Sequence, residues 1–139
     1  KMTEFEHGLP AVRVVKHQYL TRHAEKYIGS RMQAKNEDYP CKNWSSFILW
    51  NCGHFRNRVL TPAYIAKSTG THLHQFGWLK EEFIADLDPK WNVLIGEDGD
   101  DKACAVAHFT LGIPAFPHYV KVRYADEWWL THDRSRRAG

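Results

Sequence analysis

The sequence predicts a domain of the α/β class, because short apolar runs alternate with segments of helical character along the chain. Four runs rich in β-branched or apolar residues predict strands, at 11–17, 46–52, 91–95 and 103–109. The composition supports a folded core, since 43% of the 139 residues are hydrophobic and 14% are aromatic. A chain of this length fits one domain that buries about 68–70% of its unfolded surface.

The order of the segments predicts a polar connector at 1–10, one α/β domain at 11–130 and a basic, solvated tail at 131–139. Residues 18–45 are polar and contain Gly, Asn and Pro, which predicts a long excursion with a single helical turn. A loop of that length in a compact domain is usually functional. The run at 46–52 is short and nearly all apolar, so we expect a buried strand.

Three segments predict helices: residues 61–68, a stretch within 71–86 centred on 80–84, and residues 125–136. Thr61 and Pro62 suit the N-cap and the first helical position, and Gly70 is expected to end that helix. In the last helix we expect Trp128 and Trp129 to pack against the domain.

Charge and cysteine content narrow the classes of function. The net charge is +3 and the pI about 8.8, whereas nucleic-acid-binding domains usually exceed a pI of about 9 and carry a Lys/Arg stripe, so we expect no nucleic-acid partner. Three cysteines cannot form a complete disulfide framework and indicate reduced thiols in the cytoplasm. No apolar run approaches the ~20 residues of a transmembrane helix.

The strongest candidate for metal chemistry is His108, which ends a predicted strand and precedes a Gly/Pro loop. Ligands of open α/β sheets bind beyond the carboxyl ends of the strands, and a neutral imidazole there can bind a divalent metal. In the loop, Gly112 would let the backbone approach a phosphate closely. Glu97 also follows a predicted strand directly and could reach a cleft. The alternative is that His108 caps the strand and bonds to a carbonyl group.

Two other segments are candidates for sugar contacts. Asn43, Ser45 and Ser46 could bond to sugar hydroxyls, and the face of Trp44 could stack on a sugar ring; these residues are also common in a turn before a strand. The segment 70–79 is polar and contains two histidines, and it is expected to line a surface or a cleft. A structural zinc site is not expected here, because Cys41, Cys52, His54, His72 and His74 contain no C-x-x-C or H-x(3–5)-H pair.

Taken in order, a series of segments resembles a family of bacterial and phage glycosyltransferase-like proteins that is distantly similar to the retaining transferases including glycogenin. The matching segments are 14–19, 43–52, 60–62, 69–70, 73–76, 78–79, 91–92, 96–97, 108–112 and 124–128. They cover residues 11–129, and their order and spacing carry the resemblance more than any single motif does.

The resemblance implies part of a GT-A fold, an α/β/α sandwich that binds a nucleotide-diphosphate sugar. It implies that His108 binds Mn²⁺, or Mg²⁺ in its place, which holds the diphosphate. It places Asn43, Ser45 and Ser46 at donor-sugar or acceptor contacts, and it places His74 and Gln75 among acceptor-side or sugar-binding residues. The expected partners are therefore a nucleotide sugar and a glycan acceptor.

The chain departs from the family pattern at two points. The family's Asp-x-Asp metal motif belongs upstream of Ala11, and residues 1–10 contain no such motif; the two Asp-x-Asp strings, at 86–88 and 98–100, come too late in the order. The phosphate-binding Lys expected after the His is also absent, since Gly112 is followed by Ile113.

Two alternatives to catalysis are a glycan-binding or assembly module, which could dimerise through an exposed sheet edge, and a small nucleic-acid-associated phage protein.

Overall fold

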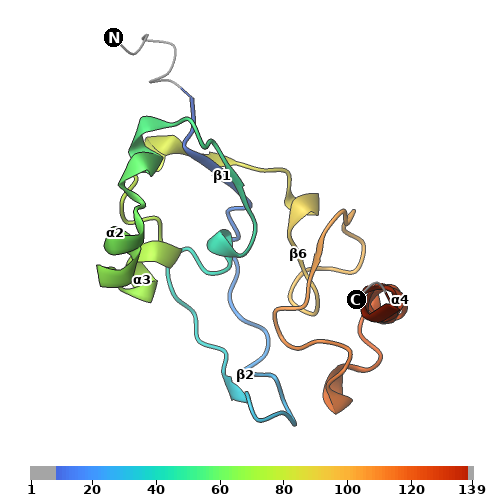
Figure 1. Cartoon of the computed structure of the whole chain (residues 1–139). Coiled ribbons are helices and arrows are strands. Elements are labelled where there is room, and N and C mark those ends of the chain that lie inside the picture. Colours follow the sequence, from blue (N-terminus) through green and yellow to red (C-terminus); the bar gives the residue numbers. More distant parts are fainter. Residues whose placement is uncertain (1–8, 138–139) are drawn as a thin grey trace. The chain divides into compact units, whose positions relative to one another are not determined.

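The computed structural model describes residues 9–137, which form a mixed α/β structure and so confirm the predicted class at that level (Figure 1). The chain divides into two compact units. Unit 1 contains residues up to Tyr19 together with Tyr39–Pro89, and unit 2 contains Leu20–Asp38 together with the residues from Lys90 onward. The domain predicted over 11–130 thus includes residues of both units.

Unit 1 contains a three-stranded sheet with β1 (Val12–Val14) in its middle. On one side β1 pairs antiparallel with β4 (Ile48–Trp50), and on the other it pairs parallel with β5 (Ile84–Asp86). The register sets Val12 opposite Trp50 and Ile84. Side chains alternate along β1, so Val12 and Val14 are buried while Arg13 between them is exposed.

The core of unit 1 forms on the buried face of this sheet. Val12, Val14, Phe76 and Ile84 make one cluster, against which four partly buried residues pack: Trp44, Ile48, Trp78 and Leu79. Phe76 has a backbone φ of 56°, a left-handed conformation that is uncommon for a bulky residue. Its ring is 1% exposed, and this burial offsets the backbone strain.

Two short helices of unit 1 follow β4 in the chain, α2 (Pro62–Lys67) and α3 (Gly70–His74) (Figure 1). The prediction for α2 is confirmed, because the Thr61 hydroxyl accepts a hydrogen bond from the amide of Tyr64 at 3.2 Å. The prediction for Gly70 is wrong, since this residue begins α3. The cause is a second N-cap, in which the Thr69 hydroxyl accepts from the amide of His72 at 3.1 Å.

The helical stretch predicted within 71–86 is confirmed only over the residues of α3, and its expected centre at 80–84 is wrong. A single 3₁₀ turn, η3 (Glu81–Phe83), leads directly into β5. The difference arises on the side of β1 that does not pair with β4. There β5 pairs in parallel with β1 and satisfies backbone groups of β1 that would lack a strand partner if these residues formed a helix. The strand predicted at 46–52 is confirmed only over β4, and it is not buried: Leu49 is 55% and Trp50 40% exposed, because β4 is an edge strand.

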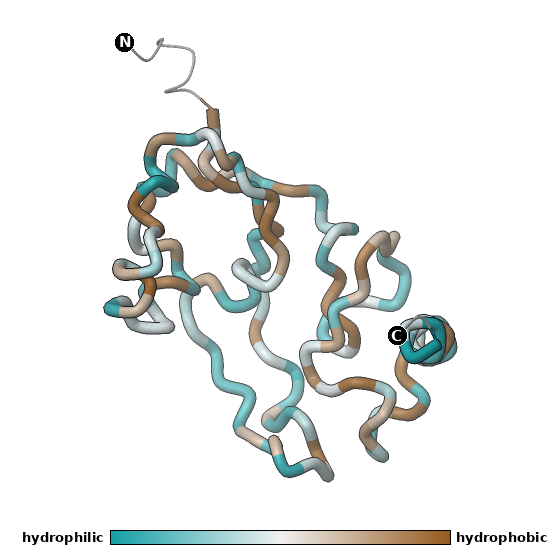
Figure 2. Tube along the Cα trace, in the orientation of Figure 1, coloured by the Kyte–Doolittle hydropathy of each residue, from teal (hydrophilic) through white to brown (hydrophobic). Residues whose placement is uncertain are grey.

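Four further 3₁₀ turns connect these elements: η1 (Trp44–Ser46), η2 (Phe55–Val59), η4 (Pro89–Trp91) and η5 (Pro117–Tyr119). The excursion predicted over 18–45 contains more structure than the single helical turn expected there. Besides η1, it holds an antiparallel pair, β2 (Glu25–Lys26) and β3 (Ala34–Lys35). The residues that leave this hairpin, 35–38, are hydrophilic (Figure 2).

Unit 2 also contains a parallel pair of strands, β6 (Val93–Leu94) and β7 (Ala107–His108), shorter than the predicted strands at 91–95 and 103–109. The last helix, α4 (Ala125–Arg137), confirms the helix predicted at 125–136. Its Trp128 is half-buried and stacks on His132, whereas Trp129 is 40% exposed and packs less than expected. No helix within residues 9–137 is both long enough and apolar enough to cross a membrane.

Candidate functional site

In unit 1 the predicted sugar-binding segment 43–46 forms a tight turn before β4. Asn43 adopts a left-handed conformation with φ 63°, which asparagine tolerates better than most residues. Its side-chain amide donates to the hydroxyl of Tyr19 at 2.8 Å. Ser46 donates its hydroxyl to the carbonyl of Asn43 at 2.6 Å. In this structure Asn43 and Ser46 therefore hold the turn together.

Trp44 lies partly buried between the turn and the core. Its indole N–H donates to the carbonyl of His17 at 3.0 Å, and the ammonium of Lys16 lies 5.7 Å from its ring centroid. These contacts fix the orientation of the indole ring and pack it against the core cluster. Its stacking on a sugar ring remains a prediction.

The structure brings together the two segments predicted to contact a sugar. Ser45 lies in η1, and His74 is the last residue of α3, 29 positions further along the chain. The Ser45 hydroxyl lies 2.8 Å from Nδ1 of His74, within hydrogen-bonding distance. Sequence reasoning marked both residues but gave no reason for them to meet.

A small hollow adjoins this pair. It has a volume of about 200 Å³ and is lined by Tyr39, Thr71, His74 and Gln75. Two hydroxyl groups, an imidazole and a primary amide can all donate and accept hydrogen bonds, and the Tyr ring adds an apolar surface. Pockets for drug-sized ligands span roughly 300–1,000 Å³, so this hollow suits one small ring or group.

Thr71 lies in the segment 70–79 that was expected to line a surface or a cleft, although it was not singled out as a site residue. It lies three positions before His74, so the two share one face of α3, and helical spacing could have paired them. Tyr39 carried no local signal. It lies in a polar stretch and reaches the hollow only through the path of the chain between β3 and η1.

In unit 2, His108 ends β7, as the sequence predicted, and its side chain is partly buried. Its Nδ1 lies 3.2 Å from the side-chain oxygen of Asn92, which is only 1% exposed. Burial lowers the pKa of His108 below its ordinary value, because the cationic ring is poorly solvated there. The imidazole is therefore neutral at pH 7, as a metal ligand must be.

His108 can supply one ligand to a divalent cation. Within residues 9–137, no three His, Cys, Asp or Glu side chains are grouped so that they could hold a metal ion. A Mn²⁺ or Mg²⁺ ion bound by His108 would therefore need ligands in addition to those of the described residues.

Glu97, which its position suggested could reach a cleft, is held in a hydrogen-bond network. Its side chain is fully buried, and its carboxylate accepts hydrogen bonds from the amide of Arg22 at 3.0 Å and from Asn36 Nδ2 at 3.1 Å. Nδ1 of His23 lies 3.7 Å away. Glu97 thus anchors the hairpin segment of unit 2. Asn36, itself buried, was not identified from the sequence.

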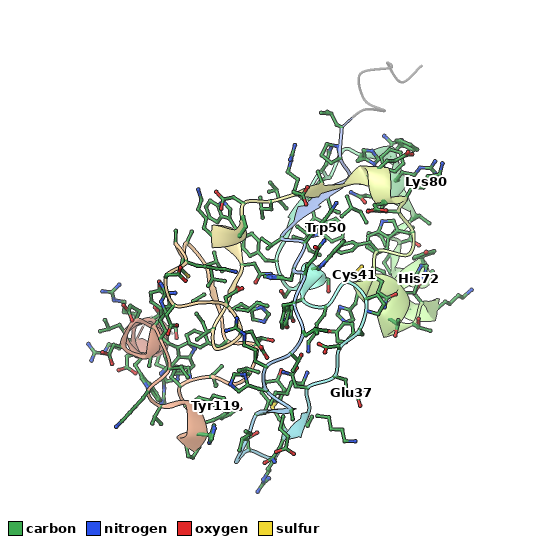
Figure 3. The ribbon with its side chains drawn as sticks, turned by 180° about the vertical axis from the view of Figure 1, so that it is seen from behind. Glu37, Cys41, Trp50, His72, Lys80 and Tyr119 are labelled. Atoms are coloured by element: carbon green, nitrogen blue, oxygen red, sulfur yellow. The ribbon has the colours of Figure 1, made fainter. Side chains whose placement is uncertain are left out.

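Gly112 is buried beside Tyr119, which Figure 3 labels. A Cβ atom added at Gly112 would lie 2.4 Å from the Tyr119 ring, so close packing accounts for the glycine. The Tyr119 hydroxyl accepts a hydrogen bond from the amide of Ile28 at 3.2 Å. Gly112 also borders a hollow of about 170 Å³ with His23 and His118, and its contact with a phosphate remains a prediction.

The three cysteines are free thiols. Cys41, labelled in Figure 3, is partly buried, and its pKa is raised first by burial and then by the nearby Glu81 carboxylate. A thiol with a raised pKa is a poor nucleophile at neutral pH, so Cys41 does not suit covalent chemistry.

No protein-family model matches this chain. A curated plant protein, Protein CDI of Arabidopsis thaliana, is 37% identical to it over 124 residues, which cover 85% of this chain and 46% of that protein. The chain therefore spans about half the length of this relative. No solved structure matches it.

Proposed function

We propose that this chain forms the acceptor-side part of a nucleotide-sugar-dependent glycosyltransferase of the GT-A type, which transfers a hexose to a glycan. The main support is the contact between Ser45 and His74 beside the hollow of unit 1. Two segments that the family resemblance assigns to sugar contacts lie together there, although they are distant in the sequence.

The chemistry of the hollow suits a sugar ring. Tyr39, Thr71, His74 and Gln75 line it, and none of them is acidic. Each can exchange hydrogen bonds with ring hydroxyls, which act as both donors and acceptors. The Ser45 hydroxyl holds the His74 ring at Nδ1, so Nε2 is the nitrogen left to contact a bound sugar.

His108 would hold the divalent cation, Mn²⁺ or Mg²⁺, that such transfer requires. When bound, the ion supplies charge neutralisation on the departing diphosphate. The neutral imidazole of His108 presents a lone pair to it. The resemblance assigns the remaining ligands to an Asp-x-Asp motif, and the relative, of which this chain covers 46%, is long enough to contain one in its unmatched part.

The test is isothermal titration of the full chain with nucleoside diphosphates, sugar nucleotides and simple glycans, each with and without MnCl₂. We expect nucleotide binding that requires Mn²⁺ and is lost in His108→Ala. We expect sugar affinity to fall about fivefold in His74→Ala, since one hydrogen bond contributes roughly 1 kcal/mol. Ser45→Ala should have a smaller effect, and Ser135→Ala in α4 is the matched control.

A non-catalytic glycan-binding module is the second candidate, and the polar hollow beside His74 favours it, because sugar binding there needs no metal ion. This function predicts sugar binding that depends on His74 and ignores both nucleotide and Mn²⁺. A chain that binds neither sugars nor nucleotides would contradict both proposals. Binding to DNA or RNA that weakens with salt would instead support a nucleic-acid role, which we do not expect.

Self-association through β4 is a further part of this proposal. Among residues 9–137, no strand pairs with the outer edge of β4, which exposes Leu49 and Trp50 beside a surface hollow of about 320 Å³. Sedimentation of the wild type and of Leu49→Lys tests this dimer, which the added positive charge should disrupt.

We also assign the protein to the cytoplasm, because its three cysteines are unpaired.

A further inference from the structure

We infer that Asn92 is a positioning residue for His108: its side-chain oxygen accepts a hydrogen bond from Nδ1–H and so leaves the lone pair on Nε2. This inference rests on the proposed role of His108 in metal binding. Its direct test is made on the metal-free protein, so the two ideas can fail separately.

The backbone of unit 2 fixes the distance between these side chains. Asn92 directly precedes β6, and His108 ends β7, the parallel partner of β6. Backbone bonds from Val93 N to Val106 O, at 3.0 Å, and from Ile95 N to His108 O, at 2.9 Å, hold the two strands in register. The separation of 3.2 Å between Asn92 Oδ1 and His108 Nδ1 is thus set on both sides by strand pairing.

Burial gives this hydrogen bond its direction. Asn92 is 1% exposed, and its carbonyl oxygen can only accept hydrogen bonds. A bare Nδ1 facing this oxygen would set two hydrogen-bond acceptors against each other at 3.2 Å, which is unfavourable inside the protein. Nδ1 therefore carries the proton, and the ring presents Nε2 as its acceptor.

This arrangement has a known physical consequence for metal ligands. A partner on the second ring nitrogen fixes both the tautomer and the ring orientation, and its loss typically lowers metal affinity about 10–100-fold. For His108 we expect loss of the Asn92 acceptor to have an effect of that size.

The decisive measurement is a long-range ¹H–¹⁵N correlation spectrum of the metal-free full chain labelled with ¹⁵N-histidine, recorded at pH 8. We expect His108 to show a protonated Nδ1 and a bare Nε2. Asn92→Asp keeps an acceptor and should keep this tautomer, whereas Asn92→Leu removes it and should shift the ring toward the Nε2–H form. His132 in α4, which bonds to Asp133, is the internal control and should not change.

A wild-type spectrum with a bare Nδ1 and a protonated Nε2 would overturn the inference, and it needs no variant. A folded Asn92→Leu protein with an unchanged tautomer would overturn it as well. The second readout is the affinity for Mn²⁺, measured from the free-ion signal in electron paramagnetic resonance. We expect this affinity to be about 10–100-fold weaker in Asn92→Leu and close to that of the wild type in Asn92→Asp. If the tautomer is as expected but the wild type binds no Mn²⁺, the inference stands and the proposed metal role fails.

Discussion

The two units differ in what holds them together. Unit 1 has an apolar cluster of Val12, Val14, Phe76 and Ile84 under a three-stranded sheet. Unit 2 has strands of two residues each and buries three polar side chains, Asn36, Asn92 and Glu97. Unit 2 also buries apolar side chains, Val93, Leu94 and Ile95 among them, but its strands are short, and buried hydrogen bonds between distant segments, such as those that Glu97 accepts, connect them.

This difference decides how the candidate residues can be tested. In unit 1, Ser45 lies in the 3₁₀ turn η1 and His74 at the end of α3, both outside the apolar cluster, so their substitution should change binding and leave the fold intact. In unit 2, Asn92 and Glu97 are candidates for function and are also buried parts of the hydrogen-bond network. Their substitution changes stability and function together, unless the replacement keeps the acceptor.

The largest effect should follow from removing the central ring of the unit 1 cluster. Phe76→Ala leaves a cavity and keeps the unfavourable backbone conformation of residue 76, so we expect the free energy of unfolding to fall by about 3–5 kcal/mol. Urea denaturation measures this loss. Leu130→Ala, at a side chain that is 59% exposed, is the control and should stay within about 0.5 kcal/mol of wild type. A loss below about 1 kcal/mol would contradict the apolar account of unit 1.

A smaller loss should follow from changing the buried carboxylate of unit 2. Glu97→Gln keeps the shape but turns an amide NH₂ toward the donors of Arg22 or Asn36, which leaves a buried group unsatisfied and should cost about 1–3 kcal/mol. Hydrogen exchange should accelerate most at the Arg22 amide, which donates to this carboxylate. If the exchange is unchanged while sugar or nucleotide binding is lost, Glu97 contacts the ligand and does not anchor the hairpin.

The sequence predicted the elements of this structure best where local chemistry decides them. The Thr61–Pro62 pair set the start of α2, and the apolar run at 11–17 contained β1. The error at residues 80–84 arose because pairing with β1, which is distant in the sequence, overrides local helical character. The hairpin β2–β3 was missed because its residues are polar and mostly exposed.

The sequence predicted individual residues of the candidate site but not their arrangement in space. Polar residues near turns marked Ser45 and His74, yet only the tertiary structure brings them within 2.8 Å. Tyr39 had no signal at all. The partners of His108 and Glu97, which are Asn92 and Asn36, lie 16 and 61 positions away in the sequence, and no local pattern connects residues so far apart.

The smallest effect we predict is a pH dependence of stability that comes from His108. Its pKa is lowered in the folded state by burial, whereas in the unfolded chain it should lie near its ordinary value of about 6.5. Between the two pKa values the unfolded state binds more protons, so the free energy of unfolding rises with pH across this window. The contribution is complete above pH 6.5, begins to be lost as the pH falls through that value, and is fully lost below the folded pKa. In His108→Gln this part of the slope should disappear. The urea midpoints of the variant and the wild type should therefore run parallel from pH 8 to 7. On further acidification they should diverge, because the wild type loses more stability than the variant. Parallel curves down to pH 5 would show that burial does not suppress protonation of this ring, and unit 2 would then tolerate a charged His108.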